Sequence, residues 1–84
     1  MAVLVVKRSI MHRYQSIGQA IEEAAPGDMI EIRDGIYEES LDIGKRLTLY
    51  GVGNVTIKGG VFIRYQTHVD MRNLRFRQGQ GMYS

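Results

Sequence analysis

The sequence predicts an all-β solenoid, in which short strands stack on one another as the coils of a parallel β-helix. Three observations support this fold class. Short apolar pairs separated by turn residues fill the segment 29–77, these pairs recur at similar spacing, and one short amphipathic helix precedes them. Strands of three to five residues cannot each bury a face alone, so they need neighbouring coils stacked against them.

One helix is expected at about residues 16–25. Ser16 and Gln19 form a candidate capping box, in which the serine oxygen and the glutamine amide satisfy the first free backbone N–H groups. Pro26–Asp28 ends the helix, because proline cannot continue the hydrogen-bond ladder and glycine allows the reversal. A helix this short must dock on something, and the open end of a sheet coil is the expected platform. Its apolar face is Ile17, Ala20, Ile21 and Ala24.

Strands are expected on both sides of this helix. The apolar run at 2–6 predicts a first strand, and after the helix the apolar period changes from 3.6 to 2. Glycine, asparagine or aspartate separates the later strands, and Gly51–Asn54 is expected to end one of them. The apolar pairs that mark these strands are Ile30/Ile32, Leu41/Ile43, Leu47/Leu49, Val55/Ile57, Val61/Ile63, Val69/Met71 and Leu74/Phe76.

The spacing of these pairs favours stacking. Ile30 and Leu47 are 17 residues apart, and Leu47 and Val69 are 22 apart. A coil of about that length with about three strands suits a parallel β-helix, whose coils lie ~4.8 Å apart. The alternative is a small antiparallel sandwich or barrel, which short strands with glycine turns also permit. We favour the solenoid because the connections are uniform and the sequence has no Asn-Gly hairpin turn.

Length and composition restrict the remaining possibilities. The 84 residues are expected to form one domain, 1–84, and the absence of cysteine excludes disulfides and thiolate metal sites. His12 and His68 have no ligand partners at metal-site spacing, so no metal or cofactor is expected. Neither a signal peptide nor a membrane span is visible, since the first apolar run is five residues long and its positive charges follow it. The chain is therefore expected to be soluble and, by default, cytoplasmic.

Charge is distributed unevenly, although the formal net charge is only +2. Residues 22–44 carry eight acidic side chains against one basic side chain, Arg33, whereas 64–77 carry four arginines against Asp70. We expect solvated faces, and the alternative is that the asymmetry orients a partner or a second copy. The arginines are a candidate ladder for a polyanion. An acidic polysaccharide suits it as well as nucleic acid does, and the acidic half of the chain argues against nucleic acid. The ladder is Arg64, Arg72, Arg75 and Arg77.

Several segments in order along the chain carry a resemblance: PGD, DGIYEE, LDIGKRLTLYG, GNVTIKGG and VDMRNLRFRQG. Together with the preceding helix they resemble the N-terminal cap and first coils of right-handed parallel β-helix proteins of the pectin lyase-like superfamily. The resemblance implies right-handed winding, about three coils, and a helix that caps the first coil and shields strand edges. It also implies that Gly35–Tyr37 turns between two sheets and that Asn73 occupies a corner with left-handed backbone.

The same resemblance argues against catalysis. Pectate lyases of this superfamily hold calcium between several aspartates, and polygalacturonases use three clustered aspartates, whereas Asp70 is the one carboxylate after the first coil. The acidic corner of Glu38, Glu39 and Asp42 is expected to be a solvated turn. His68 beside Asp70 is expected to be a surface pair, because no serine or cysteine is placed to act as its nucleophile. We therefore expect no catalytic, cofactor-binding or metal-binding residues and no enzymatic activity.

The expected function is a non-catalytic structural or assembly module. No second capping helix and no polar terminal coil follows the last apolar pairs, and solenoids normally need such caps. We therefore expect a homo-oligomer formed by end-to-end coil stacking, most simply a closed isologous dimer. The alternative is that the chain is the N-terminal fragment of a larger polysaccharide-binding or polysaccharide-degrading protein whose site lies beyond residue 84. Further coils or another domain of that parent protein would then be its partners. The expected self-association residues are Val69, Met71, Leu74 and Phe76.

Overall fold

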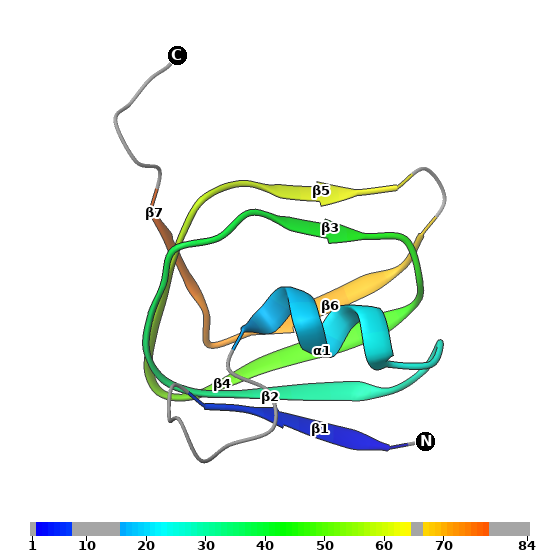
Figure 1. The fold of residues 1–84 in the computed structure, drawn as a ribbon, viewed down its shortest axis with the longest axis horizontal. Helices are drawn as coiled ribbons and strands as arrows, with labels where there is room; N and C mark the ends of the chain where they lie inside the picture. The colour runs from blue at the N-terminus through cyan, green and yellow to red at the C-terminus, as the bar shows by residue number, and fades with distance from the viewer. Residues whose placement is uncertain (1, 8–15, 65–66, 78–84) are drawn as a thin grey trace.

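A computed structural model describes residues 2–7, 16–64 and 67–77 of the chain, which form seven strands and one helix (Figure 1). Every strand pair among these residues is parallel, so the predicted β-rich fold with parallel sheets is confirmed and the antiparallel sandwich or barrel is excluded. In chain order the elements are β1 (Val3–Val6), α1 (Ile17–Glu23), β2 (Met29–Tyr37), β3 (Leu41–Ile43), β4 (Leu47–Lys58), β5 (Val61–Ile63), β6 (Val69–Arg72) and β7 (Arg75–Arg77).

The strands form two sheets between which the chain alternates. The large sheet has the order β1-β2-β4-β6, with β7 paired to the second half of β4, and the small sheet pairs β3 with β5. Met29 lies beside Thr48, nineteen residues later, because the chain crosses to the small sheet and returns before it pairs again. Figure 1 shows this path, with β3 and β5 on one side and β2, β4 and β6 on the other.

Two strands are longer than predicted. β2 has nine residues and β4 has twelve, because neither Gly35–Tyr37 nor Gly51–Asn54 ends a strand. The expectation that Gly35–Tyr37 turns between two sheets is therefore wrong: this segment stays in the large sheet after a register irregularity between Arg33 and Gly35. Gly53 has φ 82°, a conformation open to glycine, so β4 can bend there without leaving the sheet. The crossing to the small sheet comes later, between β2 and β3.

The register corrects one of the two predicted spacings. Leu47 pairs with Val69, as the 22-residue spacing predicts, but Ile30 pairs with Leu49 and Ile32 with Gly51. The predicted 17-residue spacing is thus two residues short. A shift by two keeps every side chain on the same face of a strand, so the apolar alternation does not distinguish the two registers.

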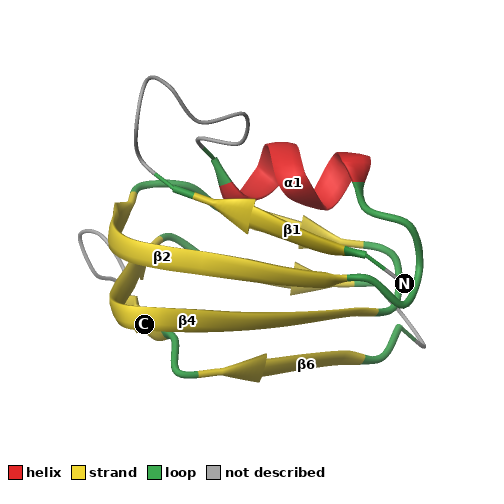
Figure 2. Ribbon diagram, turned by 90° about the horizontal axis from the view of Figure 1, so that it is seen from below, coloured by secondary structure: helices red, strands yellow, loops and turns green. Residues whose placement is uncertain are grey.

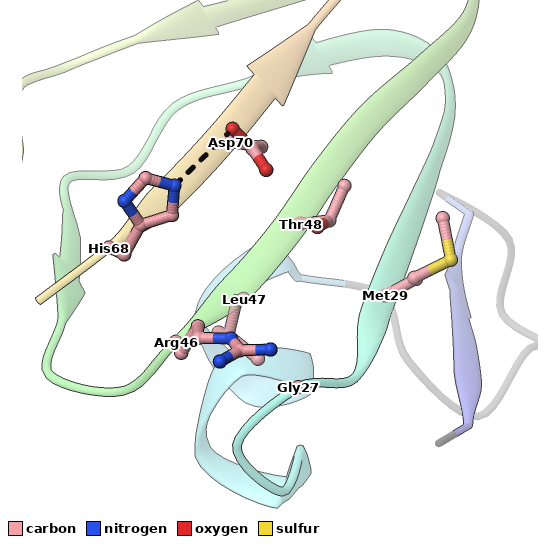
Figure 3. Close-up of a pocket in the computed structure, with 7 residues that line it drawn as sticks. All are labelled: Gly27, Met29, Arg46, Leu47, Thr48, His68 and Asp70. Carbon is pink, nitrogen blue, oxygen red and sulfur yellow. Dashed lines mark ion pairs between the residues drawn. The ribbon is translucent and has the colours of Figure 1, made fainter.

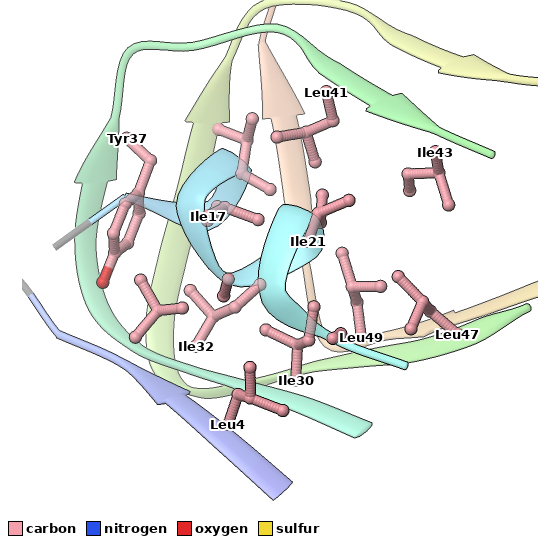
Figure 4. Packing of buried hydrophobic residues seen from close by; sticks show 14 of the residues in the cluster. Leu4, Ile17, Ile21, Ile30, Ile32, Tyr37, Leu41, Ile43, Leu47 and Leu49 are labelled. Carbon is pink, nitrogen blue, oxygen red and sulfur yellow. The ribbon is translucent and has the colours of Figure 1, made fainter. Parts of the chain in front are cut away.

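The core lies between the two sheets and is closed on one side by α1. Figure 4 shows Ile17 and Ile21 of the helix among apolar side chains from both sheets. The predicted apolar face of the helix is confirmed, since all four of its residues are buried. The strand residues of the core are Leu4, Val6, Ile30, Ile32, Tyr37, Leu41, Ile43, Leu47, Leu49, Val55 and Ile57.

Side chains from distant segments hold both ends of α1. Ser16 is the N-cap as predicted, and its hydroxyl oxygen accepts a hydrogen bond from the Gln19 N–H at 3.2 Å. The Glu39 carboxylate accepts the N–H groups of Ile17 and Gly18, both at 2.9 Å. At the other end Lys45 donates to the carbonyl oxygen of Ala24 at 2.6 Å. An acid at the N-terminus and a base at the C-terminus both match the helix dipole.

Asp28 anchors the turn between α1 and β2. Its side chain is buried, and its two oxygens accept the N–H groups of Ala2 and Ala25, both at 2.9 Å. These hydrogen bonds, with that of Ala25 the larger, lower the pKa of the Asp28 carboxyl from its ordinary value of 3.8. Asp28 therefore joins the start of β1 to the end of the helix.

Asn73 forms the corner between β6 and β7. Its backbone is left-handed with φ 55°, as the resemblance to parallel β-helix proteins implied. Its side-chain amide donates to the carbonyl oxygens of Gly51 at 2.8 Å and Gly53 at 3.3 Å. The corner thus rests on the bend of β4 directly above it, where the absence of a side chain at Gly51 leaves room for the Asn73 carbonyl.

Candidate functional site

The strands β5, β6 and β7 form the candidate site, which we call the open end of the molecule. Each of them is the last strand of its sheet in the part of the chain that the structure describes. Figure 2 shows β6 as the strand farthest from α1, which lies over the opposite end, beside β1. One end of the two sheets thus carries a helix beside the edge strand β1, whereas the other end presents the three strands β5, β6 and β7.

Exposure rises along rows of inward-pointing side chains as they reach the open end. Ile43 has no exposed surface, but its neighbour in the same row, Ile63, is 46% exposed. In the same way Ile57 is fully buried, whereas Phe76 beside it is 41% exposed. These side chains point toward the core, so the surface that they expose belongs to the end of that core. An apolar residue on an outer face exposes its surface for a different reason, because it points away from the core.

The structure brings together the residues expected to mediate self-association. Val69, Met71 and Leu74 are partly buried and pack against the core, and Phe76 is exposed beside them. The prediction missed the contribution of β5, whose Val61 and Ile63 lie over Leu41 and Ile43. The signal was present in the sequence, because Val61 and Ile63 repeat the alternation of Leu41 and Ile43.

The four arginines of the predicted ladder do not lie together. Arg64 follows β5 and holds the Asp42 carboxylate with two nitrogens, at 3.3 and 3.2 Å. Arg72 lies on β6 beside Tyr50 in the register. Arg75 and Arg77 lie on β7, where Arg77 pairs with Lys58, a cation that the prediction did not include. The structure thus separates Arg64 from the others and adds Lys58 to the pair on β7.

The acidic corner has partners of its own. Glu39 caps the helix, and Asp42 binds Arg64, while Glu38 is exposed. The expectation of a solvated turn is therefore wrong for Glu39, whose carboxylate is committed to backbone N–H groups. Among the residues that the structure describes, no group of three or more histidine, aspartate or glutamate side chains is placed to hold a metal ion.

A polar cluster crosses the outer face of the large sheet. The Tyr50 hydroxyl donates to one oxygen of Glu31 at 2.9 Å, and Arg33 contacts the other oxygen at 2.6 Å. The hydrogen bond to the carboxylate raises the pKa of Tyr50 above its ordinary value of 10.0, because ionised tyrosine could no longer donate it. The cluster links β2 to β4 from the solvent side.

A shallow hollow of about 470 Å³ lies at one end of this face. Figure 3 shows Arg46 and Thr48 of the β4 region, with His68 and Asp70 from the next strand. The His68 and Asp70 side chains are exposed, and their nearest nitrogen and oxygen are 3.8 Å apart. That geometry fits the expected surface pair. The remaining lining residues are Gly27, Met29 and Leu47.

No helix in the described ranges has the length and apolarity that crossing a bilayer requires.

Comparisons with known proteins add no family or relative. No protein-family model matches the chain, and the searches of curated proteins and of solved structures found no match either.

Proposed function

We propose that the chain is a short right-handed parallel β-helix of about three coils and that it acts as a non-catalytic assembly module. In this proposal α1 closes one end and the open end binds the same end of a second copy. The observation that carries it is the exposure of Ile63 and Phe76 in rows whose inner members are fully buried. The parallel pairing of both sheets supports the β-helix, because each strand lies over its equivalent about 20 residues earlier.

A second copy suits the open end because strand edges and apolar rows can each be covered by the same feature of another copy. Each copy would bring the same three strand edges and the same apolar rows, so the cores of the two copies would continue into one another. Two such ends meet in a closed isologous dimer, related by a two-fold axis. At the opposite end the inward-pointing residues of β1, Leu4 and Val6, are already buried, which disfavours an endless head-to-tail fibre.

The expected affinity is moderate. Burying the remaining half of an apolar side chain contributes about 1 kcal/mol, and each residue acts twice in a symmetric dimer. Association costs at least about 4 kcal/mol in lost freedom of motion. Ile63 and Phe76 together offset about this cost, and a dimer at tens of micromolar needs about 6–7 kcal/mol beyond it. The half-buried residues beside them must supply that gain.

The test is the mass in solution across a concentration series. Light scattering should give a dimer at tens of micromolar for the wild-type chain, and a monomer for the double variant Ile63→Lys/Phe76→Lys. The matched control is Ile36→Lys, because Ile36 is 54% exposed but points outward from β2. It should leave the dimer unchanged. A wild-type monomer at all concentrations would contradict the proposal, as would a folded double variant that remains dimeric.

The second candidate is a longer β-helix protein that binds or degrades polysaccharide, with its site in coils beyond residue 84. The open end favours it too, since β5, β6 and β7 present edges on which further coils of the same chain could stack. The length of the natural gene product separates the two. Further coils rich in aspartate would support the polysaccharide protein, and those coils would occupy the surface that the dimer needs.

A further inference from the structure

Three exposed cations lie on the outer wall formed by β4 and β7. Lys58 and Arg77 are partners in the register, and Arg75 lies two residues before Arg77 on the same face. Phe76 between them points the other way, toward the core, in line with Ile57. We call Lys58, Arg75 and Arg77 the basic wall. It borders the open end directly, because β7 is one of its edges.

The ion pairs between described residues do not include the basic wall. Arg33 and Arg64 each have a carboxylate within ion-pair distance, but among the described residues none lies that close to the basic wall. Glu38 follows the end of β2 near Lys58 and makes no ion pair with it. Arginine recognises phosphate and sulfate by paired hydrogen bonds, so this wall presents unused donors for an oxyanion.

We propose that the basic walls of two copies join in the dimer to form one site for a multivalent oxyanion, whose binding strengthens the dimer. This inference rests on the proposed function. If the two β7 strands pair antiparallel with Phe76 opposite its symmetry mate, Arg75 lies opposite Arg77 of the second copy. Side chains opposite one another share a face, so four guanidinium groups and two lysines gather on the outer wall of the dimer.

The site is incomplete in one copy, and this makes the anion a regulator of association. Without an anion the like charges repel one another and weaken the dimer. A polyphosphate or a sulfated oligosaccharide that spans both walls removes the repulsion. Because such a ligand binds the dimer more tightly than the monomer, it must shift the equilibrium toward the dimer.

The experiment measures the dimer dissociation constant by sedimentation velocity, with sodium tripolyphosphate and with sodium chloride at equal ionic strength. We expect tripolyphosphate to tighten the dimer about tenfold, within the usual range of coupling between sites. The double variant Arg75→Gln/Arg77→Gln should dimerise more tightly than wild type in plain buffer and should lose the response. The matched control Lys7→Gln/Arg46→Gln removes two exposed charges elsewhere and should keep it.

Each outcome separates this inference from the proposed function. If Ile63→Lys/Phe76→Lys abolishes a dimer that tripolyphosphate does not affect, the anion site is wrong and the assembly role stands. An equal response in the Arg75→Gln/Arg77→Gln variant and in its control also overturns the site. The same measurement with a sulfated oligosaccharide of similar charge identifies the kind of anion. The anion that lowers the dimer dissociation constant more shows whether phosphate or sulfate fits the site better.

Discussion

The two ends of the molecule contain the same kinds of apolar residue, but only one end covers them. At the helix end Ile17 and Ile21 close the core over β1 and the strands beside it. At the open end Ile63 and Phe76 point into the same core and remain partly in solvent. The difference teaches that burial here depends on position along a row more than on residue type, since Ile43 and Ile63 are both isoleucines of one row.

The ends also differ in how their polar groups are used. Around α1, charged side chains bind backbone groups: Glu39 and Lys45 hold the two ends of the helix, and Asp28 holds β1. On β7 both arginines are exposed, and no described carboxylate lies within ion-pair distance of them. The charged side chains around the helix are therefore used within the fold, whereas those of β7 are available for an interaction, as far as the described residues show.

The largest expected effect compares one substitution at two positions of the same row. Ile43→Ala should lower the free energy of unfolding by about 2–5 kcal/mol, because it leaves a cavity in a filled core. Ile63→Ala should lower it by about 1 kcal/mol, because half of that side chain is already in water. Urea denaturation at low protein concentration, where the chain is a monomer, measures both. Equal losses would show that the open end is as well covered as the interior.

The next effect concerns pH at the helix end. The pKa of Asp28 is lowered in the folded chain, so its stabilisation is fully present above the unfolded value near 3.8 and disappears as the pH falls through the folded value. At pH values below about 4, the urea concentration at the unfolding midpoint should therefore decrease. This loss of stability is expected to be smaller than that caused by Ile43→Ala. Asp28→Asn should lower the midpoint at neutral pH and flatten the acid part of the profile. A variant with the wild-type acid slope would assign that slope to other carboxyl groups.

The local pattern predicted much of the fold. The start of the helix and the strands β1, β3, β5 and β6 follow from periodicity, capping and turn residues, and the resemblance implied the left-handed corner at Asn73. Val69, Met71, Leu74 and Phe76 lie together because the same alternation fixes which face of a strand is apolar. The ends of β2 and β4 were harder to predict, since glycine marks a bend as readily as it marks a turn.

Interactions between successive turns of the chain could not be assigned from local pattern alone. Glu39 binds Ile17 across 22 residues, Arg64 binds Asp42 across 22, and Tyr50 binds Glu31 across 19. These sequence separations are similar to those between paired residues of neighbouring strands. The partners can therefore be identified only once the register is known. An error of two residues in that register, as for Ile30, is enough to hide them.

The smallest expected effect tests Glu39 at the covered end against its neighbour in sequence. Glu39→Gln should lower the free energy of unfolding by about 1 kcal/mol, the usual value of a helix cap, because it weakens the charge-assisted bonds to Ile17 and Gly18. Glu38→Gln changes the same charge at an exposed position and should cost less than about 0.5 kcal/mol. Helix formation, followed by circular dichroism during urea unfolding, measures both. If the two variants lose stability equally, Glu39 acts only through net charge. A loss confined to Glu39→Gln would show that one side chain, supplied from the segment before β3, fixes the helix that closes this end.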